Sequence, residues 1–85
     1  MITDRTTDRY IHNAELEPVR QALLMHFEHG ELHSRSTAGQ ILPFAMEALA
    51  DAGLPRKQSL ALMVGRQAQT AWIGIMQETA QEVDG

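Results

Sequence analysis

The last third of the chain carries the clearest hydrophobic pattern, and it predicts one long amphipathic helix over residues 54–83. At 100° per residue, its apolar and small residues fall on one side and cover roughly 200° of the circumference, about twice the width that an ordinary surface helix shows its own core. That side consists of Ala61, Val64, Gly65, Ala68, Ala71, Trp72, Ile75, Met76, Thr79 and Val83, flanked by Leu62, Ile73 and Ala80. We therefore expect part of this stripe to contact a partner.

The length of the predicted helix also favours contact with a partner. A continuous helix over residues 55–83 would be roughly 43 Å long, whereas a compact chain of 85 residues has a diameter of about 31 Å. The helix must either break, at Gly65 or Gly74, or overhang its own domain and pack against another copy or another protein. The overhang is favoured, because an interior glycine costs a helix only about 1 kcal/mol and often serves close packing.

The predicted partner-binding residues lie along this stripe. Small side chains at 61, 65 and 68 would let two helix backbones approach closely, and Trp72 would anchor the interface, since large aromatic side chains carry much of the energy of interfaces. The same tryptophan could instead be the centre of the monomer core. The predicted partner-binding set is Ala61, Val64, Gly65, Ala68, Trp72, Ile75 and Met76.

A first helix is predicted over residues 15–29. Asn13 is a suitable N-cap, Pro18 is acceptable in the first turn, where backbone N–H groups have no helical partner, and Gly30 is the expected stop. The apolar face of this helix comprises Leu16, Val19, Ala22, Leu23, His26 and Phe27. Residues 30–37 form a loop.

A second helix follows, capped by Ser36 or Thr37 and ending with Ala52. Pro43 requires either a start near Gln40 or a kink, because a proline within a helix removes a hydrogen bond. Gly53 ends this helix and Pro55 opens the long helix at its first position. The core face of the second helix comprises Ile41, Leu42, Phe44, Ala45, Ala48, Leu49 and Ala52.

These patterns predict an all-α fold, a small three-helix unit with a long C-terminal helix. Residues 13–85 would form a single helical domain, preceded by a polar and flexible arm over residues 1–12. A domain of this size buries only about 60–65% of its unfolded surface, and the chain has no cysteine with which to form a disulfide. We therefore expect stabilisation by oligomerisation, as a homodimer through the long helix.

Composition and net charge disfavour some classes of function. The chain is 44% hydrophobic and 21% charged, which is ordinary for a globular domain. Its net charge of −4 disfavours nucleic-acid binding, because proteins that bind nucleic acids usually present a basic surface. The sequence shows no secretory signal and no apolar run of about 20 residues. We expect a cytoplasmic protein without membrane contact.

Three histidines are candidate metal ligands. His26, His29 and His33 lie close together in the sequence, but their spacing matches no established zinc signature. His26 falls on the apolar face of its helix, so a packed histidine and two solvent-facing ones are the favoured interpretation. We expect no cofactor.

Two other segments indicate binding functions, one for an anion and one for DNA, but more weakly. Ser36, Thr37 and Arg35 precede a helix N-terminus and could hold an anion, although the same hydroxyls are needed to cap the helix. Residues 47–62 resemble a helix-turn-helix in outline, with Arg56 and Lys57 able to touch DNA, which makes a small transcriptional regulator the alternative function.

Catalysis has little support in the sequence. No serine stands in a sequence motif typical of a catalytic nucleophile, and the carboxylates are not predicted to pair in an apolar pocket. The sequence also contains no glycine-rich phosphate-binding loop. The pattern therefore favours a small non-enzymatic interaction module or regulator that binds a partner protein, acting as a homodimer. A histidine-cluster metal protein remains a further alternative.

Overall fold

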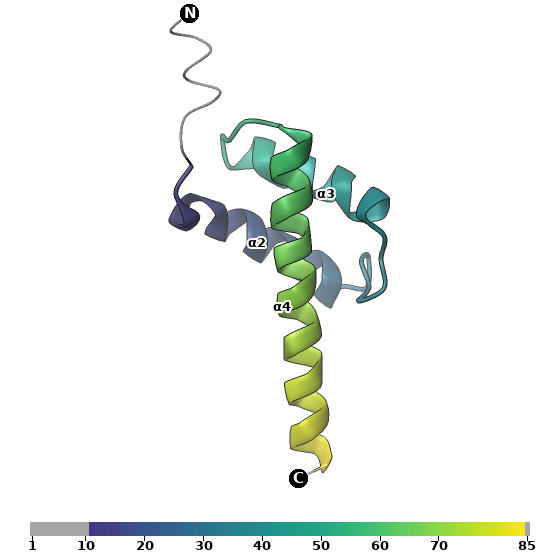
Figure 1. Ribbon diagram of the computed structural model, residues 1–85. Helices are drawn as coiled ribbons and strands as arrows, with labels where there is room; N and C mark the ends of the chain where they lie inside the picture. The colour runs from purple at the N-terminus through teal and green to yellow at the C-terminus, as the bar shows by residue number, and fades with distance from the viewer. Residues whose placement is uncertain (1–10, 85) are drawn as a thin grey trace, which may run out of the picture.

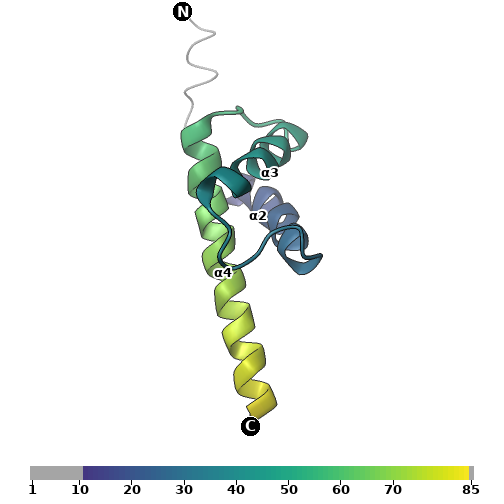
Figure 2. The ribbon, with the colours of Figure 1, turned by 90° about the vertical axis from the view of Figure 1, so that its right-hand side faces the viewer.

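Three α-helices make up the fold. The computed structural model describes residues 11–84, and the side chains of residues 11–78. The helices are α2 (Asn13–Glu28), α3 (Ala38–Asp51) and α4 (Gln58–Asp84). The described residues contain no strand, which confirms the predicted all-α class. Helices α2 and α3 lie on one side of α4 and pack against each other and against α4 (Figures 1 and 2).

The N-termini of α2 and α3 are capped in the same way. The backbone N–H of His12 donates to the Glu15 carboxylate at 3.0 Å. In α3, the backbone N–H of Thr37 donates to the Gln40 side chain at 2.8 Å, and the Thr37 hydroxyl accepts from the backbone N–H of Gln40 at 3.2 Å. A residue three positions into each helix thus reaches back to its cap, which satisfies N–H groups that lack a helical partner.

The C-termini of the two helices are also alike. Gly30 and Gly53 follow α2 and α3 with φ of +84° and +74°, a conformation that strains other residues. The chain then folds back, and Leu54 donates its backbone N–H to the carbonyl of Leu49 at 2.9 Å. The leucines just beyond the glycines, Leu32 and Leu54, are buried in the core. These turns return the chain towards the core after each helix.

Several predicted helix starts need correction. His12 caps α2 in place of Asn13, so α2 begins two residues earlier than predicted and Pro18 lies beyond its first turn. Helix α3 begins at Ala38 and runs through Pro43. Helix α4 begins at Gln58, so Pro55 lies in the connection and not at the first helical position.

All three helices contribute to one core. Its buried side chains are aliphatic except for Phe27, and they include both leucines that follow the glycine turns. They are Leu16, Val19, Leu23, Phe27, Leu32, Ile41, Ala45, Ala48, Leu49, Leu54, Ala61, Val64 and Ala68. Ile11 also packs against this core, whereas residues 1–10 of the predicted arm lie outside the described residues.

Gly65 allows α4 to approach α3 closely. A Cβ atom at Gly65 would lie 2.7 Å from Cγ2 of Ile41, which is itself 3% exposed. The close approach predicted from the small residues of the stripe therefore occurs inside one chain, between α4 and α3.

Helix α4 is continuous and extends past the other two helices. It passes through both Gly65 and Gly74 without a break, and its 27 residues span about 40 Å. The radius of gyration is 14.5 Å, compared with about 12 Å for a compact chain of this length. The C-terminal part of α4, yellow in Figures 1 and 2, projects beyond α2 and α3 in both views.

The contact at Gly65 gives a stability prediction with an internal control. Gly65→Ala should lower the free energy of unfolding by about 1–3 kcal/mol, because the added methyl group collides with Ile41 in a packed core. Gly74→Ala adds the same group to the same helix where no atom lies within 4 Å. It should raise stability by about 0.5–1 kcal/mol through helix propensity. Urea unfolding followed by circular dichroism measures both, and equal effects would contradict the close α3–α4 contact.

Candidate protein-binding surface

The face of α4 that enters the core continues beyond the region where α2 and α3 pack against this helix. We call that packed region the body of the protein. Ala61, Val64 and Ala68 are fully buried by α2 and α3. Further along the same side, Ile75 and Met76 are 43% and 51% exposed. At 100° per residue, both lie within about 80° of the direction in which Ala68 points. One face of α4 is therefore covered at Ala61, Val64 and Ala68 and open at Ile75 and Met76.

Trp72 marks the boundary between the two halves. It is partly buried, packs against the core, and its ring stacks on Phe27 with centroids 6.1 Å apart and an interplanar angle of 25°. Trp72 thus belongs to the monomer core, as the alternative interpretation held, and still presents part of its surface to solvent.

The predicted partner-binding set is divided by this boundary. Four of its members, Ala61, Val64, Gly65 and Ala68, are buried within the chain itself. Their contacts are with α2 and α3, so no partner can reach them in this conformation. Trp72, Ile75 and Met76 remain at the surface, and the surface open to a partner begins at Trp72.

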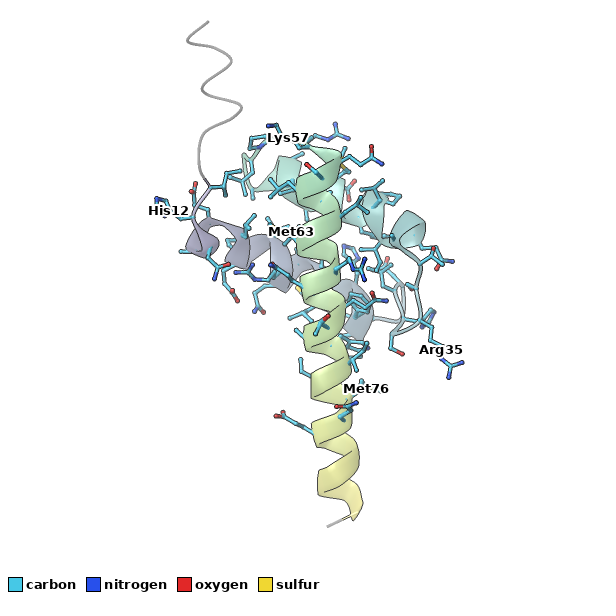
Figure 3. The ribbon with its side chains drawn as sticks, viewed as in Figure 1. His12, Arg35, Lys57, Met63 and Met76 are labelled. Atoms are coloured by element: carbon cyan, nitrogen blue, oxygen red, sulfur yellow. The ribbon has the colours of Figure 1, made fainter. Side chains whose placement is uncertain are left out.

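A hollow lies beside the open half of α4. It has a volume of about 400 Å³ and is lined by Ser34, Arg35, Ile73, Met76 and Gln77. Ile73 is 37% exposed, and Figure 3 shows Arg35 and Met76 on the same side of the molecule. The sequence pattern placed Ile73 only at the flank of the stripe and gave no signal for Ser34 or Gln77. We call Arg35, Trp72, Ile73, Ile75 and Met76 together the overhang surface.

Gln69 fixes the loop that carries Arg35. Its side-chain amide donates to the carbonyls of Ser34 and Ser36 at 3.0 and 2.8 Å. These two carbonyls flank Arg35, whose side chain points away from the helices (Figure 3). The guanidinium is thus presented at the rim of the hollow by a backbone that is tied to α4.

The loop hydroxyls that could bind an anion serve the backbone instead. Ser36 accepts a hydrogen bond from the backbone N–H of His33 at 2.8 Å, and Thr37 caps α3. Arg35 points outward, away from this helix N-terminus. The described geometry therefore does not assemble these three side chains around one anion.

The three histidines do not converge. Nδ1 of His26 lies 2.6 Å from a carboxylate oxygen of Glu31, and its ring packs on Phe44 with centroids 4.7 Å apart. His26 is partly buried and not fully enclosed in the core, whereas His29 and His33 are exposed. Within residues 11–78, no group of three or more histidine, aspartate or glutamate side chains could hold a metal ion.

The basic residues of the helix-turn-helix candidate lie far from the overhang surface. Arg56 and Lys57 are exposed just before α4, and Gln58 is its first residue. Figure 3 places Lys57 at the opposite end of the body from Met76. In the part of the chain that the structure describes, no helix is long and apolar enough to cross a membrane.

Comparisons of the chain with protein families, curated proteins and solved structures gave no match. A function can therefore be inferred only from the chain's own residues. Among the surfaces described, the overhang surface combines exposed apolar side chains with a hollow and a positioned charge.

The Gln69 contacts can be tested by deleting them. Gln69→Ala leaves two loop carbonyls without their donor and should lower the free energy of unfolding by about 1–2 kcal/mol. It should also speed hydrogen exchange in residues 33–37. Gln77→Ala makes the same chemical change eight residues further along α4, at an exposed position, and should change stability by less than about 0.5 kcal/mol. Unaltered exchange in the loop of Gln69→Ala would show that Gln69 does not hold it.

Proposed function

We propose that this chain is a non-enzymatic protein-binding module that docks a partner protein on its overhang surface. The observation that carries the proposal is the exposure of Ile75 and Met76 on the face that, one to three turns earlier, forms the core. Exposed apolar side chains gain free energy when they are covered, by about 25 cal/mol for each Å² of apolar surface removed from water.

The projecting part of α4 also gains from a partner. Residues 73–84 of α4 follow Trp72, which packs against the core. A helical segment of about 12 residues is only marginally stable in water by itself. A partner that packs along this segment would supply the contacts that α2 and α3 supply to the first half of α4.

The character of the surface indicates the kind of partner. Ile73 and Met76 line the hollow, and Arg35 stands at its rim. Such a surface suits an amphipathic helix that places apolar side chains at intervals of three and four residues along a groove. An acidic residue on that helix would complement Arg35 and favour one orientation.

The described carboxylates support a role without catalysis. Glu17, Glu28 and Glu47 are exposed, and the exposed Glu31 pairs with His26. Enzymes that use a carboxylic acid as a general acid raise its pKa by burial. At Glu17 the opposite holds, because hydrogen bonds from Gln21 and Arg20 lower the pKa of its carboxyl.

The test compares two methionines on α4. Met76→Glu replaces apolar surface by a charge in the overhang surface and should abolish capture of a partner from native lysate, because a partner that covers this position must remove the carboxylate from water. Met63→Glu is the matched control. Met63 is 43% exposed and lies nearly opposite Ala68 around the helix, so capture should be unchanged. Circular dichroism should show both variants folded.

Two results would replace this proposal. Equal capture by Met76→Glu and the unmodified chain would show that the overhang surface is not the docking site. Nanomolar binding to duplex DNA that weakens steeply with salt, and weakens further in Arg56→Ala with Lys57→Ala, would favour the transcriptional regulator.

A further inference from the structure

We infer that the overhang surface selects a partner helix with a carboxylate three or four residues from an apolar side chain, and that Gln69 sets this preference by positioning Arg35. The inference rests on the proposed function. It names the group on the partner that the surface recognises and the residue of this chain that makes the recognition selective. Three observations support it, namely the charge at the hollow, the hydrogen bonds of the loop beside it, and the attachment of that loop to α4.

The charge at the hollow is positive. Among the described residues that line it, Arg35 alone is charged, and the others are Ser34, Ile73, Met76 and Gln77. A guanidinium group only donates hydrogen bonds, and its planar fork matches the two oxygens of a carboxylate. A basic side chain on the partner would instead bring a like charge towards Arg35. The charged group that complements this hollow is therefore a carboxylate.

The hydrogen bonds of the loop favour the same group. The carbonyls of Ser34 and Ser36 already accept hydrogen bonds from the Gln69 side chain, at 3.0 and 2.8 Å. The backbone that flanks Arg35 is thus less able to accept a hydrogen bond from a basic side chain of the partner. The Arg35 side chain, in contrast, is exposed and can donate. Hydrogen bonding therefore favours an acidic group at this rim, as charge does.

Gln69 also sets the position of this charge relative to the apolar side chains. It lies on α4 four residues before Ile73, so the two are neighbours on adjacent turns of the helix. The loop is thereby attached to the helix that lines the hollow with Ile73 and Met76. A loop that is already ordered loses less conformational freedom when Arg35 engages a partner. Gln69 is therefore a positioning residue that acts through Arg35.

This arrangement specifies a pattern in the partner. A helix presents residues three and four apart on one side. When an apolar side chain of the partner covers Ile73 and Met76, the residue one turn away lies at the rim of the hollow with Arg35. A carboxylate at that position gives the helix one orientation. Because Arg35 is exposed, the pair should strengthen binding by about two- to fivefold, and by less in high salt.

Selection of helical peptides on the full chain provides the probe. The library has apolar residues at intervals of three and four and random residues between them. The peptides counted are those that fail to bind the doubly substituted chain Ile73→Gln, Met76→Gln but still bind Met63→Gln. These substitutions remove apolar surface without adding a charge, so they do not bias the charge of the peptides that are counted.

Charge reversal then tests the preference. The counted peptides should carry Asp or Glu one turn from an apolar residue more often than Lys or Arg. Selection on Arg35→Glu should reverse this preference. Selection on Arg66→Glu, which makes the same change of net charge elsewhere on α4, should retain it. A preference that is unchanged in Arg35→Glu, or failure to select any such peptide, would overturn the inference.

The role of Gln69 is tested with one selected peptide made with Glu, Gln or Lys at the acidic position. The Glu form should bind the unmodified chain about tenfold more tightly than the Lys form at low salt. Gln69→Met keeps the length of the side chain but removes its donors, so this ratio should fall to about threefold or less. The affinity of the neutral Gln form should change by less than about twofold. An equal loss for all three forms would show that Gln69 only supports the fold.

These outcomes separate the inference from the proposed function. If capture of a partner from lysate is abolished by Met76→Glu but the selected peptides show no preference for acidic residues, the inference fails and the protein-binding function stands. If light scattering shows a dimer that the Ile73→Gln, Met76→Gln chain does not form, a second copy occupies the surface and the inference is overturned. The Arg35→Glu selection does not depend on whether Gln69→Met folds.

Discussion

The architecture depends on one long helix being covered over only part of its length, because α2 and α3 cross α4 in its first half (Figure 1). Helices α2 and α3 have 16 and 14 residues, about 24 and 21 Å, whereas α4 has 27 residues and spans about 40 Å. The apolar face of α4 continues beyond what the two short helices cover. The covered half forms part of the core, and the half beyond it exposes Ile75 and Met76.

Contacts made by the covered half of α4 also position the residues around the hollow. Close packing at Gly65 and Ile41 sets α3 against α4. Gln69, one turn further along α4, ties the loop before α3 to the same helix through two carbonyls. That loop carries Arg35 to the rim of the hollow beside Ile73 and Met76. A charged side chain from one segment and apolar side chains from another are thus held in one place by contacts of the monomer core.

Much of this fold could be predicted from the sequence, because helical periodicity and glycine stops are local signals. The predicted ends of α2 and α3 at Gly30 and Gly53 agree with the structure to within about a residue. Leu32 and Leu54 were missed as core residues, because Leu32 was placed in a loop and Leu54 at the start of the predicted long helix, before the stripe that begins at Ala61. An apolar residue just after a C-terminal glycine is nevertheless a known feature of such turns and could have indicated them.

The division of the long stripe could not be predicted in the same way. Periodicity gives the direction in which a side chain points around the helix, but not how far along the helix its neighbours extend. Val64 and Ile75 point to nearly the same side, yet one is fully buried and the other is 43% exposed. The difference is set by where α2 and α3 end in space. That position depends on tertiary packing and on the Trp72–Phe27 contact.

Hydrogen–deuterium exchange along α4 tests the central claim, that α2 and α3 cover one face of this helix at Ala61, Val64 and Ala68 and leave Ile75 and Met76 open. Amides of residues 73–84 should exchange much faster than those of residues 61–72, because Ile75 and Met76 are exposed whereas Ala61, Val64 and Ala68 are buried. Protection that is equal in both halves of α4 would contradict the account.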